Sequence, residues 1–155
     1  MLRRSLRLGS QFLVALGATS SMAMAEQQAG HANTSDQEAF TKVCGACHPA
    51  SAVNGLRTLS EWRDTIEHMI SIGARGTDED FDSVMRVLER TLTKVNVNTA
   101  NSDEIAPVMN ISDTAAQAVV AYRSTHGNFK SLSDLKKVPG LDAAKVDSRK
   151  DRVLF

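Results

Sequence analysis

The feature that most constrains this chain is the hexapeptide Val-Cys-Gly-Ala-Cys-His at residues 43–48, which contains the only two cysteines. Two thiols at C-x-x-C spacing can each add to one vinyl group of haem, and a histidine directly after them is placed to ligate the iron. Phe40 and Val43 fall with the two cysteines at positions i, i+3, i+4 and i+7, so a helix would bring both sulfurs to one side. We therefore expect one covalent haem c, attached through Cys44 and Cys47 and ligated by His48.

Three other uses of a C-x-x-C sequence compete with haem attachment. A thioredoxin-type dithiol requires a strand leading into a helix within an α/β sheet, and no such sheet is indicated. A structural zinc site would need two of the four histidines (His31, His48, His68 and His126), which form no second pair with ligand-like spacing. A structural disulfide is chemically possible, but it leaves the following histidine unexplained. Haem attachment is the favoured interpretation.

The N-terminus indicates export from the cytoplasm. Arg3, Arg4 and Arg7 form a positive region, Phe12 to Ala18 a short apolar core, and residues 23–25 a small-x-small cleavage signal. This pattern predicts a secretory signal peptide over residues 1–25, too short for a membrane span. The product is expected in the bacterial periplasm, where haem c is attached.

Charge and patterning predict two modules in the mature chain. Residues 26–155 carry 15 basic and 18 acidic side chains, a net charge of −3. Residues 26–92 have a net charge of −5 and residues 93–155 of +2, which suggests modules with different partners. We expect a flexible leader over 26–35, a haem domain over 36–92 and a second domain over 93–155.

The first module is predicted to be three short helices around the haem, with no strand required. Ser60 is a plausible N-cap for a second helix that ends near Gly73, and Thr77 with Asp80 forms a capping-box variant for a third. The apolar stripe of the second helix is Trp62, Ile66, Met69 and Ile70, and that of the third is Phe81, Val84, Met85 and Leu88. A domain this small would gain much of its core from the haem itself.

The segment after the cysteines, E-W-x-x-T-I-x-x-M-x-x-x-G-A from Glu61 to Ala74, resembles small monohaem cytochrome c domains associated with periplasmic dehydrogenases. The resemblance covers roughly residues 40–92 and implies Met69 as the second axial ligand of the iron. His68 is the alternative, and an open or weakly ligated iron is the third. Met85 is expected to be core packing, and Met109 lies in the other half of the chain.

The second half repeats with an offset of 30 residues. Ile105, Val108, Asn110, Ile111 and Ala116 align with Leu135, Val138, Gly140, Leu141 and Val146. Each copy is predicted to be helix, tight hairpin, helix. Asn101 with Glu104 begins the first copy, Gly127 ends it, and Ser131 to Asp134 caps the second.

This half resembles the tandem helix-hairpin-helix module of competence DNA receptors of the ComEA type. The matching segments are V-N-V-N-T-A at 95–100, A-x-x-x-V-x-x-Y-R at 115–123 and H-G-x-F-K-S-x-x-D-L at 126–135. In DNA-binding members each hairpin carries G-x-G, whose amides hold a phosphate. Here the hairpins read Asn110-Ile111-Ser112 and Gly140-Leu141-Asp142. Three of four glycines are absent, and Asp142 places a carboxylate where a phosphate would lie.

We thus expect an all-α protein, a mini cytochrome c domain followed by a tandem helix-hairpin-helix domain. The favoured function is single-electron transfer, with the second domain docking a redox partner such as a periplasmic dehydrogenase or terminal cytochrome. The alternative is a periplasmic DNA-binding protein with a structural or sensory haem, supported by Lys145, Arg149, Lys150 and Arg152 near the C-terminus. No catalytic dyad is apparent, so enzyme activity is not expected.

Overall fold

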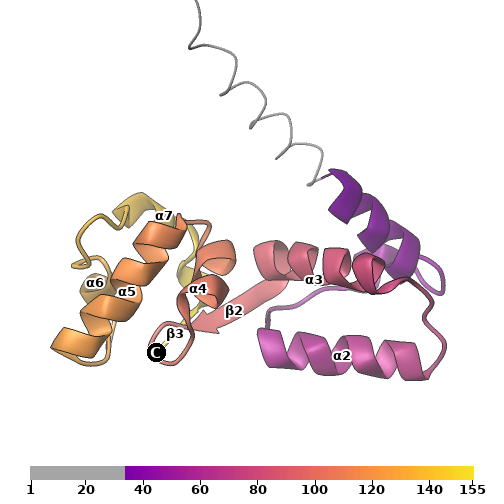
Figure 1. Cartoon of the computed structure of the whole chain (residues 1–155), viewed down its shortest axis with the longest axis horizontal. Coiled ribbons are helices and arrows are strands. Elements are labelled where there is room, and N and C mark those ends of the chain that lie inside the picture. The colour runs from indigo at the N-terminus through magenta and orange to yellow at the C-terminus, as the bar shows by residue number, and fades with distance from the viewer. Residues whose placement is uncertain (1–33) are drawn as a thin grey trace, which may run out of the picture. The chain divides into compact units, whose positions relative to one another are not determined.

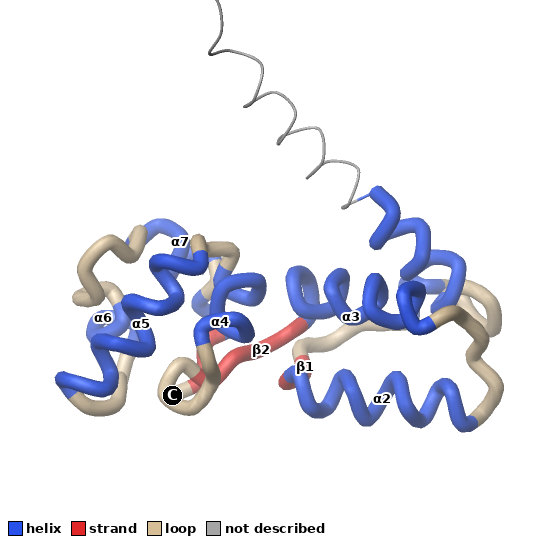
Figure 2. The backbone as a smooth tube through the Cα atoms, viewed as in Figure 1, coloured by secondary structure: helices blue, strands red, loops and turns tan. Residues whose placement is uncertain are grey.

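The computed structural model describes residues 34–155 (Figure 1). The predicted signal peptide, nearly all of the predicted leader and His31 lie outside the described residues. Among residues 34–155, none of the helices has the length and apolar character needed to cross a membrane. The described chain is mainly helical, as expected from its periodicity (Figure 2).

The segment up to residue 92 holds three helices. The first spans residues 34–44 and leads into the turn of the C-x-x-C-H sequence, after which a 3₁₀ turn, η1 (Ala50–Ala52), follows. Helix α2 covers Leu59–Ser71, and α3 covers Asp78–Leu92 beside it (Figure 1). The cap of α3 is the predicted pair Thr77 and Asp80. The cap of α2, however, is Thr58 rather than Ser60, because Glu61 stands at the third helical position and bonds back to the Thr58 amide.

The prediction that no strand is needed is wrong. Strand β1 (Arg57–Thr58), β2 (Thr93–Asn96) and β3 (Val153–Leu154) form a small parallel sheet in that order. The first half of β2 pairs with β1, and its second half pairs with β3. Two-residue strands are too short to show an alternating pattern, so hydrophobic periodicity gave no sign of them.

One apolar cluster lies within residues 40–92. Its buried members are Phe40, Val43, Trp62, Val84, Val87 and Leu88. The Trp62 indole donates from Nε1 to the carbonyl oxygen of Leu92 at 3.0 Å, which ties the start of α2 to the end of α3. The buried Asp36, on the first helix, accepts hydrogen bonds from two arginines of α3, Arg90 at 2.7 Å and Arg86 at 3.0 Å. Burial opposes ionisation of Asp36, but these bonds outweigh it and lower its pKa.

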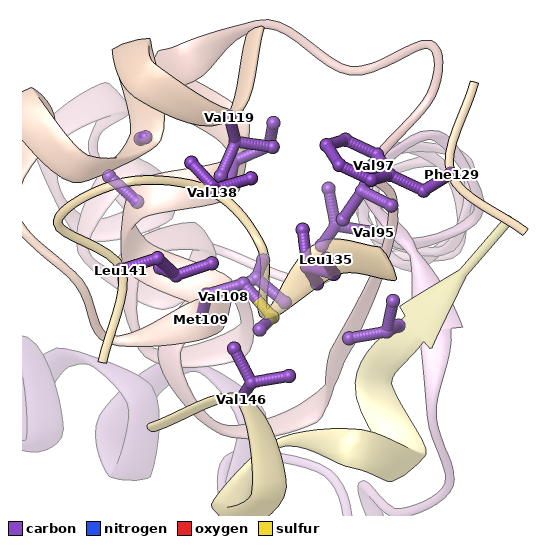
Figure 3. Close-up of a cluster of buried hydrophobic side chains, with 14 residues drawn as sticks. Val95, Val97, Val108, Met109, Val119, Phe129, Leu135, Val138, Leu141 and Val146 are labelled. Atoms are coloured by element: carbon purple, nitrogen blue, oxygen red, sulfur yellow. The ribbon is translucent and has the colours of Figure 1, made fainter. Parts of the chain in front are cut away.

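A second apolar cluster lies within residues 95–153, and the four helices of the second half all contribute side chains to it (Figure 3). Those helices are α4 (Ser102–Met109), α5 (Asp113–His126), α6 (Leu132–Leu135) and α7 (Ala143–Ser148), with a 3₁₀ turn, η2 (Lys150–Arg152), before β3. The repeat predicted from the sequence is visible in the burial of its paired positions. The buried pairs are Ile105 with Leu135, Val108 with Val138, and Ala116 with Val146.

The V-N-V-N segment has a structural role in this second half. The Asn98 side chain bonds both ways with the backbone of Phe129: its Nδ2 donates to the carbonyl oxygen at 2.9 Å, and its Oδ1 accepts from the amide at 2.8 Å. Arg123 donates to the carbonyl oxygen of Val97 at 2.6 Å. Three segments distant in sequence are thereby held together through buried or half-buried polar groups that are all satisfied.

Arg152 joins the C-terminus to the first region. This residue is buried, and its guanidinium donates to the carbonyl oxygen of Arg90 at 2.8 Å. Arg149 makes a longer bond of 3.4 Å to the same carbonyl. Because α3 ends at Leu92, the Arg90 carbonyl lies in the last turn and lacks an intrahelical donor. The two arginines supply the missing donors.

Candidate functional site

All four residues expected to hold haem line a single cavity of about 430 Å³. Cys44, Cys47 and His48 approach it from the turn after helix 34–44, and Met69 approaches from α2. Most of the other lining side chains are apolar, among them Val43, Val53, Trp62, Ile66, Phe81 and Leu88. The volume lies within the range of about 300–1,000 Å³ that is common for ligand and cofactor pockets.

The two cysteines are free thiols in this structure. Cys44 is half-buried at the end of the helix, and Cys47 is exposed in the turn. Burial raises the pKa of the Cys44 thiol. The turn itself is tight, since the Gly45 amide bonds to the Thr41 carbonyl at 2.9 Å and a Cβ at residue 45 would lie 2.3 Å from that oxygen. Glycine is therefore required between the cysteines.

His48 has a hydrogen-bond partner that the sequence left unassigned. Its Nδ1 lies 3.2 Å from the carbonyl oxygen of the adjacent Pro49. In the tautomer with a proton on Nδ1, this bond leaves Nε2 as the atom available to a metal. The ring is exposed, so nothing within the described chain covers it.

The candidates for a second axial ligand separate in space. Met69 is half-buried and lines the cavity, whereas the neighbouring His68 is exposed and is absent from the lining. Met85 packs against the apolar cluster of the first region, and Met109 is buried in the second cluster. The assignment of Met69 stays a prediction, although its position agrees with it.

The donor set and the cavity fit a haem and fit no bare metal ion. Among residues 34–155, no group of three or more His, Cys, Asp or Glu side chains is placed to hold a metal. Two thiols, one imidazole and one thioether around an apolar cavity match the needs of a porphyrin that brings its own four nitrogen ligands.

The first hairpin, Asn110 to Ser112, keeps the backbone geometry of a glycine turn without a glycine. Asn110 has φ 52° and ψ 49°, a left-handed conformation that asparagine tolerates better than most residues. The amides of Asn110 and Ile111 both bond to the carbonyl oxygen of Ala106. Ser112 caps α5 by accepting a bond from the Ala115 amide at 3.2 Å. Within residues 34–155, no acceptor is bonded to the amides of residues 112–114.

The second hairpin, Gly140 to Asp142, also has a residue with positive φ at the equivalent position, 30 residues later, although its hydrogen bonds differ. Gly140 has φ 79°, and the Leu141 amide bonds to the Val138 carbonyl at 3.2 Å. As predicted, Asp142 caps the next helix: its Oδ1 accepts from the Ala144 amide at 2.8 Å. That helix, α7, has only 6 residues. Compared with the first hairpin, the second therefore precedes a shorter helix and places a carboxylate, not a hydroxyl, at the helix start.

Cations lie beside the second hairpin. Lys145 and Lys150 are exposed and Arg149 is half-buried, and none of the three forms an ion pair with the described chain. Two further lysines in this region are neutralised, because Lys136 pairs with Asp147 and Lys137 with Asp134 at 2.8 Å. His126 is exposed and stacks on Tyr122 with ring centroids 4.0 Å apart, which explains this pair as packing at the end of α5.

Residues 91–153 match the helix-hairpin-helix motif, so this region is a helix-hairpin-helix domain. The chain is 38% identical over 63 residues to an uncharacterized protein of Haemophilus influenzae, which covers 40% of this chain and 56% of that protein. It is 30% identical over 59 residues to ComE operon protein 1 of Bacillus subtilis, covering 38% and 29% of the two chains. Human endonuclease/exonuclease/phosphatase family domain-containing protein 1 is 35% identical over 60 residues, only 10% of its length. No solved structure matches significantly.

These matches correct the expected function. They concern the helix-hairpin-helix motif of residues 91–153 and a ComE operon protein, and they give no support to a cytochrome, an iron-binding electron carrier or a redox partner. The interpretation as a single-electron transfer protein is therefore wrong, and the alternative drawn from the sequence fits better. Attachment of haem to the cysteines is a separate prediction, which no match tests.

The sequence reasoning missed one residue at the cavity. Arg57 lines it beside the cysteines, yet it lies in a stretch without periodicity and belongs to no motif. No signal in the sequence distinguished it from an ordinary surface arginine.

Proposed function

We propose that this protein binds duplex DNA in the periplasm through its helix-hairpin-helix domain, in the manner of a competence DNA receptor. The match of residues 91–153 to the motif is the observation that carries the proposal. The similarity to ComE operon protein 1 and the two hairpins with left-handed residues at Asn110 and Gly140 support it.

The first hairpin is the better phosphate contact. Its free amides, at residues 112–114, point from the start of a 14-residue helix, whose dipole favours an anion at that end. The capping oxygen of Ser112 is neutral, so it does not repel a phosphate. Asp113 is acidic but exposed, and no hydrogen bond within residues 34–155 holds its carboxylate over the amides.

The second hairpin contributes chiefly through charge. Asp142 occupies the Ala144 amide and repels an anion there, whereas Lys145, Arg149 and Lys150 attract the backbone nearby. Contacts of this kind are independent of base sequence and sensitive to salt. We expect weak, sequence-independent binding to duplex DNA rather than recognition of a particular site.

In the same proposal, residues 36–92 hold a covalent haem c through Cys44, Cys47 and His48, with Met69 as second axial ligand. The shared cavity supports this assignment. When bound, the haem would supply an apolar plate for a small core and an iron that can sense ligands or redox state. The chain's own part would be to fix the haem through two thioethers and to exclude water from the cavity with the apolar side chains of Trp62, Ile66 and Phe81.

The decisive variant is Asp113→Pro. Residue 113 is the first position of α5, where proline fits the helix, and Ser112 before it has φ −70° and ψ 156°, which proline allows. The substitution removes one free amide without disturbing the helix. Asp113→Ala is the matched control, since it removes the same carboxylate but keeps the amide.

We would titrate a labelled duplex with the chain from residue 26 onward and follow fluorescence anisotropy. Asp113→Ala is expected to bind as well as the parent or better, and Asp113→Pro several-fold more weakly than Asp113→Ala, because one charge-assisted hydrogen bond is lost. Equal binding by these two variants, or no binding by the parent at about 50 mM salt, would contradict the proposal.

A further inference from the structure

Arg57 is the one charged side chain at the cavity besides the titratable groups of the attachment sequence. Among the described residues that line the cavity, it is the only Lys, Arg, Asp or Glu. Asn54 and Thr65 are uncharged polar neighbours, and most of the remaining surface is apolar. A cavity of this composition suits a ligand with an apolar body and a single anionic edge.

The position of this cation is fixed by packing. The guanidinium carbon of Arg57 lies 5.2 Å from the ring centroid of Trp62, a cation–π contact. Trp62 is only 2% exposed and is anchored to the Leu92 carbonyl. The backbone of Arg57 is held as well, because it pairs with Thr93 in the parallel sheet. Arg57 is exposed, but the contact with Trp62 and the strand pairing hold its side chain at the cavity.

The Arg57 guanidinium has no salt-bridge partner in the described chain, although the Glu61 carboxylate interacts with it electrostatically at longer range. The nearby Glu61 carboxylate is engaged elsewhere, since its Oε2 accepts from the Thr58 amide at 2.6 Å and from the Thr58 hydroxyl at 2.9 Å. These bonds lower the pKa of Glu61, with a smaller contribution from Arg57. The guanidinium donors remain available to a ligand.

We propose that Arg57 binds a carboxylate of the molecule that fills this cavity. This inference rests on the proposed haem attachment, under which the carboxylate is a haem propionate. Arginine suits the task because its planar donors match a carboxylate and it stays charged at every physiological pH. Trp62 is then a positioning residue, which holds the guanidinium over its ring.

The test compares ferric haem with its dimethyl ester, which has the same macrocycle but no carboxylates. Each is titrated into the apo chain from residue 26 onward, with its cysteines reduced, and binding is followed by absorbance. The parent is expected to prefer the free acid about three- to tenfold, the range for one partly exposed charge pair. Arg57→Gln is expected to remove the preference, and Arg57→Lys to keep most of it. Arg75→Gln is the matched control, because Arg75 is exposed and does not itself line the cavity.

The outcomes distinguish a failure of the Arg57 proposal from a failure of the proposed haem attachment. Equal binding of the two probes by the parent, or an undiminished preference in Arg57→Gln, overturns the role of Arg57 and leaves haem attachment standing. Failure of both probes to bind, together with no covalent haem on chain produced with a haem-attachment system, overturns the haem proposal and this inference with it.

Discussion

Replacing Asp142 by serine gives the second hairpin the capping residue of the first. Serine is the residue at the equivalent position 112, where it caps α5. In the parent protein the Asp142 carboxylate lies 2.8 Å from the Ala144 amide. Asp142→Ser keeps a capping oxygen at the start of α7 and removes the negative charge. Two like charges about 4 Å apart repel by about 1 kcal/mol in water, so DNA affinity should rise roughly fivefold at low salt. Asp142→Ala should gain similar affinity but lose about 1 kcal/mol of stability with the cap.

The assay is anisotropy of a labelled duplex at about 50 mM and about 200 mM salt, with unfolding by urea for each variant. Asp151→Asn is the matched control: Asp151 is exposed and close to the C-terminus, and the change in net charge is the same. The gain for Asp142→Ser should shrink at the higher salt concentration, because the repulsion is screened. If Asp151→Asn raises affinity as much as Asp142→Ser, the effect is one of net charge and the reasoning about the hairpin is refuted.

Three further predictions concern stability. Asn110→Ala should lower the free energy of unfolding in urea by about 1 kcal/mol, because alanine disfavours the left-handed conformation. Asn110→Gly should leave the stability unchanged, and equal losses in the two variants would count against this reasoning. Arg152→Met should lose about 2 kcal/mol, since it strips the Arg90 carbonyl of its 2.8 Å donor, while the longer bond of Arg149 makes Arg149→Met a mild control. Asp36→Asn should lower the free energy of unfolding by about 2 kcal/mol at pH 7. Because the folded pKa of Asp36 is lowered, this loss should be complete above pH 3.8 and should vanish as the pH falls through the folded pKa. A loss that is independent of pH would contradict the role of the ion pairs.

The sequence predicted the parts of this fold that rest on repeated local patterns. The capping residues Thr77, Asn101 and Ser131 are side-chain acceptors at helix starts, a signal contained within four residues. The 30-residue repeat predicted the positions of both hairpins and the buried residues that are equivalent in the two copies. Helical stripes likewise gave α2, α3 and the apolar face toward the cavity.

Long-range contacts were beyond the reach of those patterns. The strands β1 and β3 have two residues each, and they exist because β2 passes between them in space. The pattern predicted Ser60, two residues past the actual cap Thr58, because periodicity locates a helix start only to within a residue or two. Arg57 lies in strand β1, and the pairing of β1 with β2 places it beside the cavity. Its position therefore depends on tertiary packing, which a local sequence pattern does not reveal.

The expected function failed for a different reason. The attachment sequence at residues 43–48 indicates a cofactor, and electron transfer was inferred from the cofactor and from a family resemblance. Holding haem and transferring electrons to a partner are separate properties, and a site fixes only the first. The absence of glycine at positions 110 and 112 does not exclude the hairpin geometry. Asparagine adopts the left-handed turn, and a serine cap leaves the neighbouring amides free.

The most direct test of the central claim is to observe the hairpin amides while DNA binds. Two-dimensional ¹H–¹⁵N spectra of the chain from residue 26 onward, recorded during titration with a short duplex, report each amide separately. DNA binding through the helix-hairpin-helix domain predicts that the largest shifts occur at residues 112–114, with smaller ones at residues 140–145 and little change in α2. Spectra that stay unchanged, or shifts concentrated in residues 36–92, would contradict it.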